Sequence, residues 1–289
     1  MVNNQVILSF AESLDPDETI LVSYTDATAA NDVNAIQDKS GNDIASFSNV
    51  EVGNALGLTA SGTESFAFAS TISLAGAEIS AFDAASGRLF VTSASGLQVV
   101  SVDANLQMTL LSTLTLGSND LNSVAVKNGI VAVAVADVDK TLSGKVFFLD
   151  ADGDLKSPLG SVTVGANPDM LTFSADGKSV LVANEGEMAS IASNPEGSVS
   201  IIDLSQGVAG ATVKTASFSA FNDKFAELRA EGVRLFDGIT VANDLEPEYI
   251  SISPDGKTAF VTLQESNALG ILDIATATFT DIVPLGLKS

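Results

Sequence analysis

The 289-residue sequence contains no cysteine, no tryptophan and no histidine. These absences exclude disulfide bonds, zinc sites built from cysteine or histidine, and any mechanism that uses an imidazole base. Basic residues are also scarce: 13 lysines and arginines stand against 36 aspartates and glutamates, which gives a net charge of −23 at pH 7. Such a surface attracts cations and repels nucleic acid and anionic membranes, so neither of these is an expected partner.

Long apolar runs are missing as well. No stretch of about 18 apolar residues occurs, so membrane insertion is not expected. The opening MVNNQVILSF lacks the basic flank, long apolar stretch and small-residue cleavage site of a signal peptide. Apolar residues still make up 46% of the chain, which is enough for a large core.

A unit of two apolar segments around a glycine turn, followed by a third segment that ends in aspartate, occurs four times. The fourth copy includes EYISISPDGKTAFVTLQ and the third includes DMLTFSADGKSVLVANEGE. Four short strands in about 40–45 residues are typical of a β-propeller blade. The sequence predicts an all-β fold, a partial β-propeller of four four-stranded blades at about 78–117, 121–165, 166–220 and 246–286.

Other segments surround these units. FAFASTISLAG (66–76) is similar to the last strand of each unit, which predicts one additional outer strand. Residues 186–197 form a loop inside the third blade, and 206–247 separate the third and fourth blades. Within the latter we expect a short helix with Asn222 as N-cap and Gly232 just after its end. Residues 57–65 are small and polar, as in a linker.

Side-chain roles follow from the same pattern. Arg88, Lys178 and Lys257 come directly after turn glycines, which predicts surface positions. Four phenylalanines in strand segments are expected to pack between blades: Phe90, Phe147, Phe173 and Phe260. If the ring is incomplete, the last blade exposes an apolar face from Phe260 through Ile274 and around Val283, and such exposed faces and edges associate with other chains.

Residues 1–56 differ from the rest. The stretch YTDATAANDVNAIQDKSGND (24–43) resembles the cyanobacterial swimming-motility-type (SWM) repeat, an immunoglobulin-like β module that recurs in very large surface proteins. The resemblance implies the end of one such β-sandwich repeat. Four aspartates in this region either order a long loop or bridge a cation: Asp26, Asp32, Asp38 and Asp43.

From residue 66 onward the chain resembles the choice-of-anchor I family. The resemblance rests on AEISAFD (77–83), PDMLTFSADGKSVLVANEGE (168–187) and DLEPEYISISPDGKTAFVTLQESNAL (244–269), among other motifs. That family overlaps proteins described as atypical alkaline phosphatases and as mesenchyme-type surface glycoproteins. The resemblance implies an extracellular or cell-surface location and a propeller of more than four blades, so we expect this chain to be a fragment of a longer protein.

Acidic residues stand at matching positions of the units, before the first strand and after the second. The first strand of a blade lines the central channel, so these residues are predicted to meet at the channel mouth; Asn122 breaks the series in the second unit. Converging carboxylates suit Ca²⁺, which takes six to eight oxygen ligands. The candidate cation site, through which phosphate or glycan could bind, comprises Glu78, Asp169, Glu185, Glu187, Glu246, Glu248 and Glu265. The alternative is that these residues only cap turns or are solvated.

LDADGDLKS (149–157) begins like a calcium loop, with aspartates at 150, 152 and 154. Its glycine is misplaced for such a loop and no bidentate glutamate follows. An aspartate ends the third strand in every unit, which favours a hairpin role for Asp103, Asp150, Asp203 and Asp273.

Two functions remain open. The first is a non-catalytic interaction module of a large acidic surface protein, with the rest of the polypeptide, a neighbouring surface protein or a glycan as partner. The alternative, which the family resemblance implies, is a Ca²⁺-dependent phosphomonoesterase in the full-length parent. The sequence lacks a G-x-S-x-G elbow and a histidine base, so hydrolysis would have to be metal-assisted, and no catalytic residue is assigned.

Overall fold

The computed structural model describes residues 20–26, 45–52, 68–117, 120–153 and 158–286, in two compact units, 1–68 and 69–289. In the first unit, β1 (Ile20–Tyr24) pairs antiparallel with β2 (Phe47–Val52). The rings of Tyr24 and Phe47 lie 5.9 Å apart between centroids. Three of the four N-terminal aspartates and the linker lie outside the described residues, so the immunoglobulin-like repeat stays a prediction.

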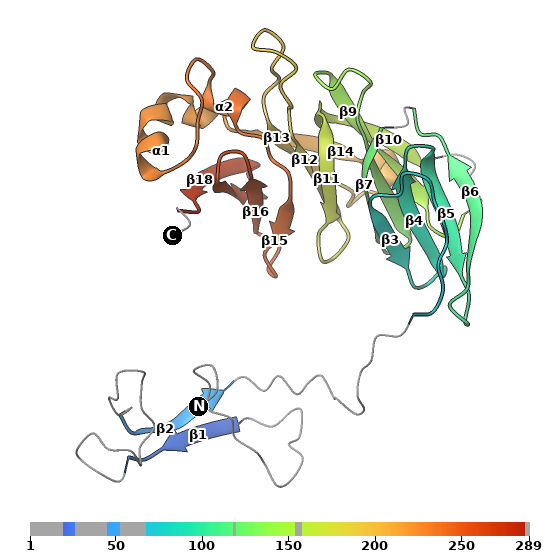
Figure 1. The fold of residues 1–289 in the computed structure, drawn as a ribbon, viewed down its shortest axis with the longest axis horizontal. Coiled ribbons are helices and arrows are strands. Elements are labelled where there is room, and N and C mark those ends of the chain that lie inside the picture. The colour runs from blue at the N-terminus through green and yellow to red at the C-terminus, as the bar shows by residue number, and fades with distance from the viewer. Residues whose placement is uncertain (1–19, 27–44, 53–67, 118–119, 154–157, 287–289) are drawn as a thin grey trace. The chain divides into compact units, whose positions relative to one another are not determined.

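The second unit consists of four antiparallel sheets of four strands, each formed by consecutive strands (Figure 1). Blade 1 contains β3 (Ser80–Asp83), β4 (Arg88–Ser93), β5 (Gly96–Val102) and β6 (Met108–Leu114). Blade 2 contains β7 (Leu121–Lys127), β8 (Ile130–Val135), β9 (Ser143–Asp150) and β10 (Gly160–Ala166). Blade 3 contains β11 (Pro168–Phe173), β12 (Ser179–Asn184), β13 (Ser198–Asp203) and β14 (Thr212–Ser217). Blade 4 contains β15 (Ile250–Ile252), β16 (Thr258–Leu263), β17 (Ala268–Asp273) and β18 (Thr278–Pro284).

The first strands β3, β7, β11 and β15 follow one another along the inner side of the arc, which we call the hub (Figure 1). The all-β fold and the propeller-like arrangement of four blades are therefore confirmed.

The middle strands explain why the blades stack. In β8, Val131 and Val133 belong to the core between blades 1 and 2, whereas Ala132 and Ala134 belong to the core between blades 2 and 3. Successive side chains of a strand point to opposite faces, so a strand between two neighbours must be apolar on both. The same alternation places Leu181 of β12 in the core shared with blade 4.

The glycine turns recur with the same geometry. Gly177 and Gly256 have φ values of +73° and +70°, a region that side chains other than glycine rarely adopt. In the residue before each, a carboxylate oxygen accepts the backbone N–H two residues ahead, at 3.0 Å for Asp176 and 3.1 Å for Asp255. The hydrogen bonds that these two carboxylates accept lower their pKa below the usual aspartate value.

The predicted hairpin role of the strand-ending aspartates is confirmed. Each carboxylate accepts a nearby backbone N–H: Asp103 from Asn105 at 2.8 Å, Asp150 from Asp152 at 3.0 Å, Asp203 from Ser205 at 2.8 Å and Asp273 from Thr276 at 2.8 Å. Residues 154–157, the rest of the calcium-like segment, lie outside the described part of the chain.

Two predictions, the additional outer strand before blade 1 and the surface position of Arg88, are wrong. The described residues 68–79 contain no strand, although Ser70, Ile72 and Leu74 are half-buried and alternate with exposed residues as in one. No strand of the described residues pairs with this segment. Arg88 is not a simple surface residue, because its guanidinium donates to the carbonyls of Ala151 at 2.8 Å and Gly153 at 2.9 Å and so ties blade 1 to blade 2.

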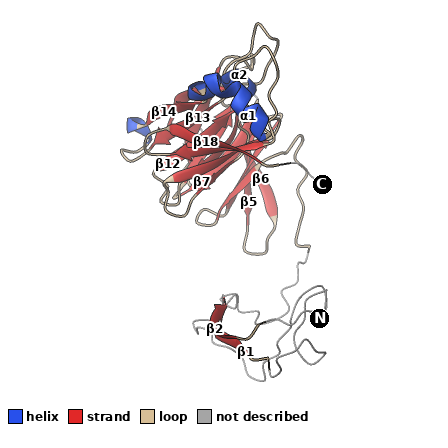
Figure 2. Ribbon diagram, turned by 90° about the vertical axis from the view of Figure 1, so that its left-hand side faces the viewer, coloured by secondary structure: helices blue, strands red, loops and turns tan. Residues whose placement is uncertain are grey.

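The segment 206–247 differs in part from expectation. Its first third contains η2 (Val208–Gly210) and then β14, the last strand of blade 3. After η3 (Ser219–Lys224), the expected helix is present as α1 (Phe225–Glu231), which ends at Gly232 with φ +110°. Asn222 is not its N-cap; instead, its side-chain oxygen accepts the N–H of Ala242 at 2.9 Å, at α2 (Val241–Asp244). Both helices lie at one end of the sheets (Figure 2).

The face of blade 4 that points away from blade 3 is apolar and uncovered. Phe260 is 43% exposed and Val283 is 39% exposed. On the neighbouring strand, Phe260 pairs with Ile271, and Val283 with Leu269. The prediction that Phe260 packs between blades is therefore wrong within this chain, and Ile274, expected on the same face, packs against the core instead.

The equivalent face of blade 1 packs against a neighbouring blade. The motif Phe-Val-Thr occurs in β4 and again in β16, and in both blades the phenylalanine pairs with the residue three positions after the acidic residue at the hub. Phe90 of β4 is fully buried, in the core between blades 1 and 2. Phe260 occupies the equivalent position but has no next blade against it in the described chain.

We expect the purified chain to self-associate through this uncovered face of blade 4. Substituting Phe260→Thr keeps a residue favoured in strands and removes the largest apolar side chain, which is worth about 1.5–3 kcal/mol when buried. The association constant should fall on the order of tenfold or more in sedimentation velocity experiments. The control Val138→Thr changes a residue that is 86% exposed on another surface and should associate like the parent. A parent chain that stays monomeric contradicts the prediction.

Candidate functional site

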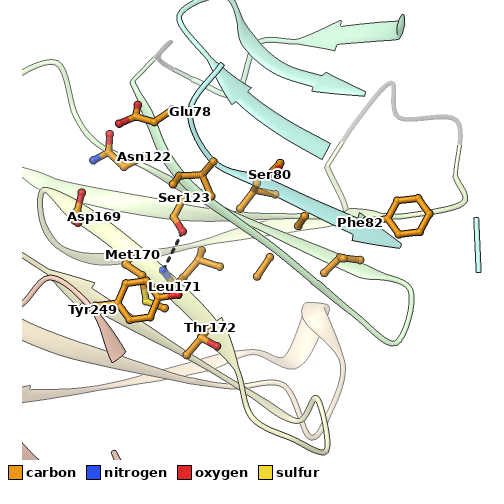
Figure 3. Close-up of a pocket in the computed structure, with 15 residues that line it drawn as sticks. Glu78, Ser80, Phe82, Asn122, Ser123, Asp169, Met170, Leu171, Thr172 and Tyr249 are labelled. Carbon is orange, nitrogen blue, oxygen red and sulfur yellow. Dashed lines mark hydrogen bonds between the residues drawn. The ribbon is translucent and has the colours of Figure 1, made fainter. Parts of the chain in front are cut away.

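The hub contains a groove of about 540 Å³ between β3, β7 and β11, with Tyr249 at one side. Figure 3 shows Glu78, Asn122 and Asp169 near one another at one end, which we call the hub mouth. Inside the groove, the hydroxyl of Ser123 accepts the N–H of Leu171 at 3.2 Å and so joins blade 2 to blade 3 (Figure 3). The groove therefore has an acidic mouth and a largely apolar floor.

Two carboxylates of the mouth are positioned in the same way. The N–H groups of Glu78 and Glu248 donate to the carbonyls of Thr92 and Thr262, each at 3.1 Å. The next residue in each case donates its N–H to the hydroxyl of the same threonine, at 3.1 Å in blade 1 and 2.9 Å in blade 4. The repeated Phe-Val-Thr motif thus places an acidic residue at the mouth in both blades.

In blade 3, Asn167 organises the mouth. It is 3% exposed and has φ +46°, a conformation that asparagine adopts more readily than most residues. Its amide nitrogen donates to Glu185 at 2.6 Å and, more weakly, to Glu187 at 3.5 Å. Its amide oxygen accepts from Lys140 at 3.1 Å and from Asn122 at 3.4 Å.

Lys140 is the cation of this region. It forms an ion pair with Asp120 in addition to its bond with Asn167. Its charge counteracts only part of the effect of burial and of Glu78, so the pKa of Asp169 is still raised above the usual aspartate value.

The glutamates of the mouth raise the pKa of one another. Burial raises the pKa of Glu185 to about 7, with further contributions from Asp169 and Glu187. Burial, together with a hydrogen bond that it shares with Glu265, raises the pKa of Glu248 to about 8. Burial and the charge of Glu265 also raise the pKa of Glu246. Carboxylates held this close favour bound protons or a cation over full ionisation.

The structure brings all seven predicted carboxylates together. Each of them interacts electrostatically with at least one other: Glu78, Asp169, Glu185, Glu187, Glu246, Glu248 and Glu265. Glu78, Glu187 and Glu265 are exposed and the other four are half-buried. Within the described residues, no three acidic side chains already lie in the geometry that holds a metal ion, so a cation would require these side chains to turn inward.

Two side chains at or just after the ends of the second strands of blades 1 and 2, Ser93 and Asp137, have local roles. The Ser93 hydroxyl donates to the carbonyl of Gly96 at 2.8 Å in its own turn, and the carboxylate of Asp137 accepts the N–H of Asp139 at 3.0 Å. Sequence reasoning missed Asn167 and Lys140. The Asn-Pro dipeptide at 167–168 is a turn signal in the sequence and could have indicated Asn167. No local pattern indicates Lys140, because its role depends on contact with Asn167 of the neighbouring blade.

A family model, the choice-of-anchor I domain, matches residues 78–289. The match covers all four blades and both insertions. The chain belongs to the choice-of-anchor I family. A choice-of-anchor domain indicates a cell-surface protein. In the described part of the chain, no helix has the length and apolar character needed to cross a membrane.

One solved β-propeller shares the fold of this choice-of-anchor I domain at low sequence identity, and other solved structures align with it. The β-propeller domain of Cps50 (Swd1) from Myceliophteria thermophila has a TM-score of 0.50 and 14% identity, over 75% of this chain and 58% of that one. A functionally unknown protein from Desulfotomaculum acetoxidans has a TM-score of 0.48 and 15% identity, over 74% and 58% of the two chains. A chain of a nidogen/laminin complex has a TM-score of 0.44 and 15% identity, over 72% and 63%.

These structures are longer than the part that aligns. The chain spans 58–63% of the length of these three solved structures. A comparison with curated proteins found no match.

The raised pKa values predict that stability falls as pH rises from about 5 to 8. Between the ordinary glutamate pKa of 4.5 and the folded values of about 7 for Glu185 and about 8 for Glu248, the folded state holds protons that the unfolded chain has lost. The free energy of unfolding therefore decreases with pH in this window. Below it, aspartates with lowered pKa such as Asp203 lose their stabilising effect as they are protonated. Thermal unfolding monitored across this range measures the slope.

The variant Glu185→Gln/Glu248→Gln should flatten the decrease in melting temperature between pH 5 and 8, because both groups with pKa values of about 7 and 8 are removed. The control Glu231→Gln removes a carboxylate from the end of α1 and should keep the slope of the parent. An unchanged slope in the double variant contradicts the assignment.

Asn167→Asp should destabilise the mouth strongly. The variant tolerates the positive φ but cannot donate to Glu185, and it adds a like charge; a lost buried partner alone costs about 1–3 kcal/mol. The matched control is Asn128→Asp, at φ +51° and exposed, where the amide donates only to the carbonyl of Asp176 at 3.1 Å. Chemical denaturation at neutral pH compares the two, and equal losses contradict the role of Asn167.

Proposed function

We propose that this chain is a non-catalytic interaction module of a cell-surface protein, in which the propeller is a binding platform and the hub mouth binds Ca²⁺. The observation that carries the proposal is the convergence of seven carboxylates from three blades and two insertions on one end of the hub. Membership of the choice-of-anchor I family supports the surface location.

The chemistry of the mouth favours calcium. Ca²⁺ accepts six to eight oxygen ligands in flexible geometry, and carboxylates from several loops supply such a set. A bound divalent cation would replace the protons that Glu185 and Glu248 hold near neutral pH and would remove the repulsion among the remaining carboxylates. The exposed side chains of Glu78, Glu187 and Glu265 have room to turn toward such an ion.

The platform that we propose is larger than these four blades. Phe90 is buried by the next blade, and the equivalent Phe260 is exposed, which supports a further blade on the outer face of blade 4. The alignment over 58% of the longer Cps50 propeller domain agrees with this reading. The partner of the platform is then the remainder of such a polypeptide, a neighbouring surface protein or a glycan.

Calorimetric titration with CaCl₂ tests the cation. We expect saturable binding that is at least about tenfold tighter at pH 8 than at pH 6, because at the lower pH the ion must displace protons from groups with pKa values of about 7 and 8. Glu248→Gln should weaken binding, whereas Glu231→Gln should not. Absence of heat together with an unchanged melting temperature in millimolar Ca²⁺ would refute the calcium site.

The non-catalytic part has a separate test. The choice-of-anchor I resemblance implies a Ca²⁺-dependent phosphomonoesterase as the alternative, so hydrolysis of p-nitrophenyl phosphate is measured with and without Ca²⁺. We expect no turnover above the rate in buffer. Calcium-dependent turnover that Glu248→Gln abolishes would overturn the non-catalytic assignment and favour the alternative.

A further inference from the structure

A second cavity, of about 310 Å³, lies between the two insertions, and none of the residues that line it lines the hub groove. Its walls come from the loop 186–197 inside blade 3 and from the segment that follows α1. Three of the apolar side chains that line it are strongly exposed: Met188 at 45%, Ile191 at 82% and Phe236 at 58%. Large apolar side chains gathered around one cavity are typical of a small-molecule site.

The walls of this pocket are joined to each other. The side chain of Asn243 donates to the carbonyl of Asn194 at 2.6 Å, and the N–H of Gly197 donates to Ala242 at 3.0 Å. The approach at Gly197 is so close that a Cβ there would lie 1.9 Å from the carbonyl oxygen of Leu245. The two insertions are therefore packed and hydrogen-bonded to each other, although they are separate in the sequence.

The pocket is acidic. The described residues that line it include four acidic side chains and no basic one. Asp237 pairs with Arg229 at 2.5 Å, and the carboxylate of Asp244 accepts the N–H of Phe236 at 2.6 Å and lies near Arg234.

The other two acidic residues, Glu246 and Glu265, have no basic partner among the residues that line the pocket, although the N–H of Met188 donates to Glu246 and Glu265 shares a hydrogen bond with Glu248. The charge of Glu265 contributes to the raised pKa of Glu246. A positive group placed between them would be attracted by both carboxylates.

The side chain of Asn194 gives independent evidence for a ligand in this pocket. Both polar atoms of its side-chain amide are buried and, in the described structure, have no hydrogen-bond partner. Native proteins pair nearly all buried amides, and an unpaired one costs about 1–3 kcal/mol. The pocket wall therefore contains a donor and an acceptor that have no partner in the described structure.

We propose that this pocket binds a small organic cation with an apolar body, such as an aromatic or branched-alkyl amine. The apolar body packs against Ile191 and Phe236, and the ammonium group lies between Glu246 and Glu265. The volume, at the small end of ligand sites, suits an amine of this kind rather than a large ligand. A bare metal ion would leave the apolar walls unused, and an anion would be repelled.

The test uses phenethylamine as the probe, with phenethyl alcohol as its neutral analogue and hydrocinnamate as its anionic analogue. Binding to the full chain is followed by ligand-observed NMR. We expect saturable binding of the amine, at least about fivefold weaker binding of the alcohol, and no binding of the anion. Equal affinity for amine and alcohol would overturn the proposal, as would absence of saturable amine binding.

Two variants locate the site. Phe236→Ala should weaken amine binding about tenfold, because it removes an aromatic wall. The matched control Phe260→Ala, which alters the uncovered face of blade 4, should bind like the parent. Loss of binding in both variants to the same extent would show that the amine binds elsewhere.

Two variants separate this site from the hub mouth, although the two share Glu246 and Glu265. Phe236→Ala should retain Ca²⁺ binding. Asp169→Asn, which replaces a carboxylate of the hub groove that does not line this pocket, should weaken Ca²⁺ binding and retain amine binding. If the chain binds the amine but not Ca²⁺, the amine site is supported and the calcium site is refuted. If it binds Ca²⁺ but not the amine, the calcium site is supported and the amine site is refuted.

Discussion

Packing of each blade against a neighbour through both faces of its middle strands is the constraint on which this structure depends. Strands such as β8 and β12 divide their side chains between two separate cores, so neither strand is stable without a blade on each side. This requirement fixes the stacking of the sheets, and in the described part of the chain the outer face of blade 4 does not meet it. The repeated Phe-Val-Thr motif shows the effect of a missing neighbour: Phe90 is buried against blade 2, whereas the equivalent Phe260 is exposed.

The same stacking explains why so much negative charge gathers at the hub mouth. The first strands of neighbouring blades run side by side, so the residues that precede them meet at one end. Threonines 92 and 262 hold two of these residues through backbone and hydroxyl together, and Asn167 holds a third region through four contacts. The carboxylates are thereby fixed near one another by groups that stabilise the blades, and their raised pKa values are a consequence of that placement.

Much of this could be predicted from the sequence because the signals are local. A glycine with a preceding aspartate determines its own turn, and an aspartate at the end of a strand accepts backbone N–H groups a few residues ahead, whatever the rest of the chain does. Five of the seven acidic residues of the mouth could be predicted because the same position recurs in successive units, and Glu187 and Glu246 because they lie close to those positions in the sequence. Asn222 shows the limit: it has the features of an N-cap, yet α2 offers it an N–H donor from twenty residues away.

The features that could not be predicted depend on contacts with residues that are distant in the sequence. Residues 68–76 have the alternation of a strand, but a strand exists only where another strand pairs with it. The pocket between the insertions depends on Asn194 meeting Asn243, and each of the two loops reads alone as an irregular connection. Insertions of this kind are tolerated at the ends of blades because they leave the inter-blade cores intact, and loops carried on a rigid scaffold are where binding sites arise. In this chain the scaffold is the stack of blades, and the two insertions that interrupt its repeat meet beside the acidic mouth that the repeat itself creates.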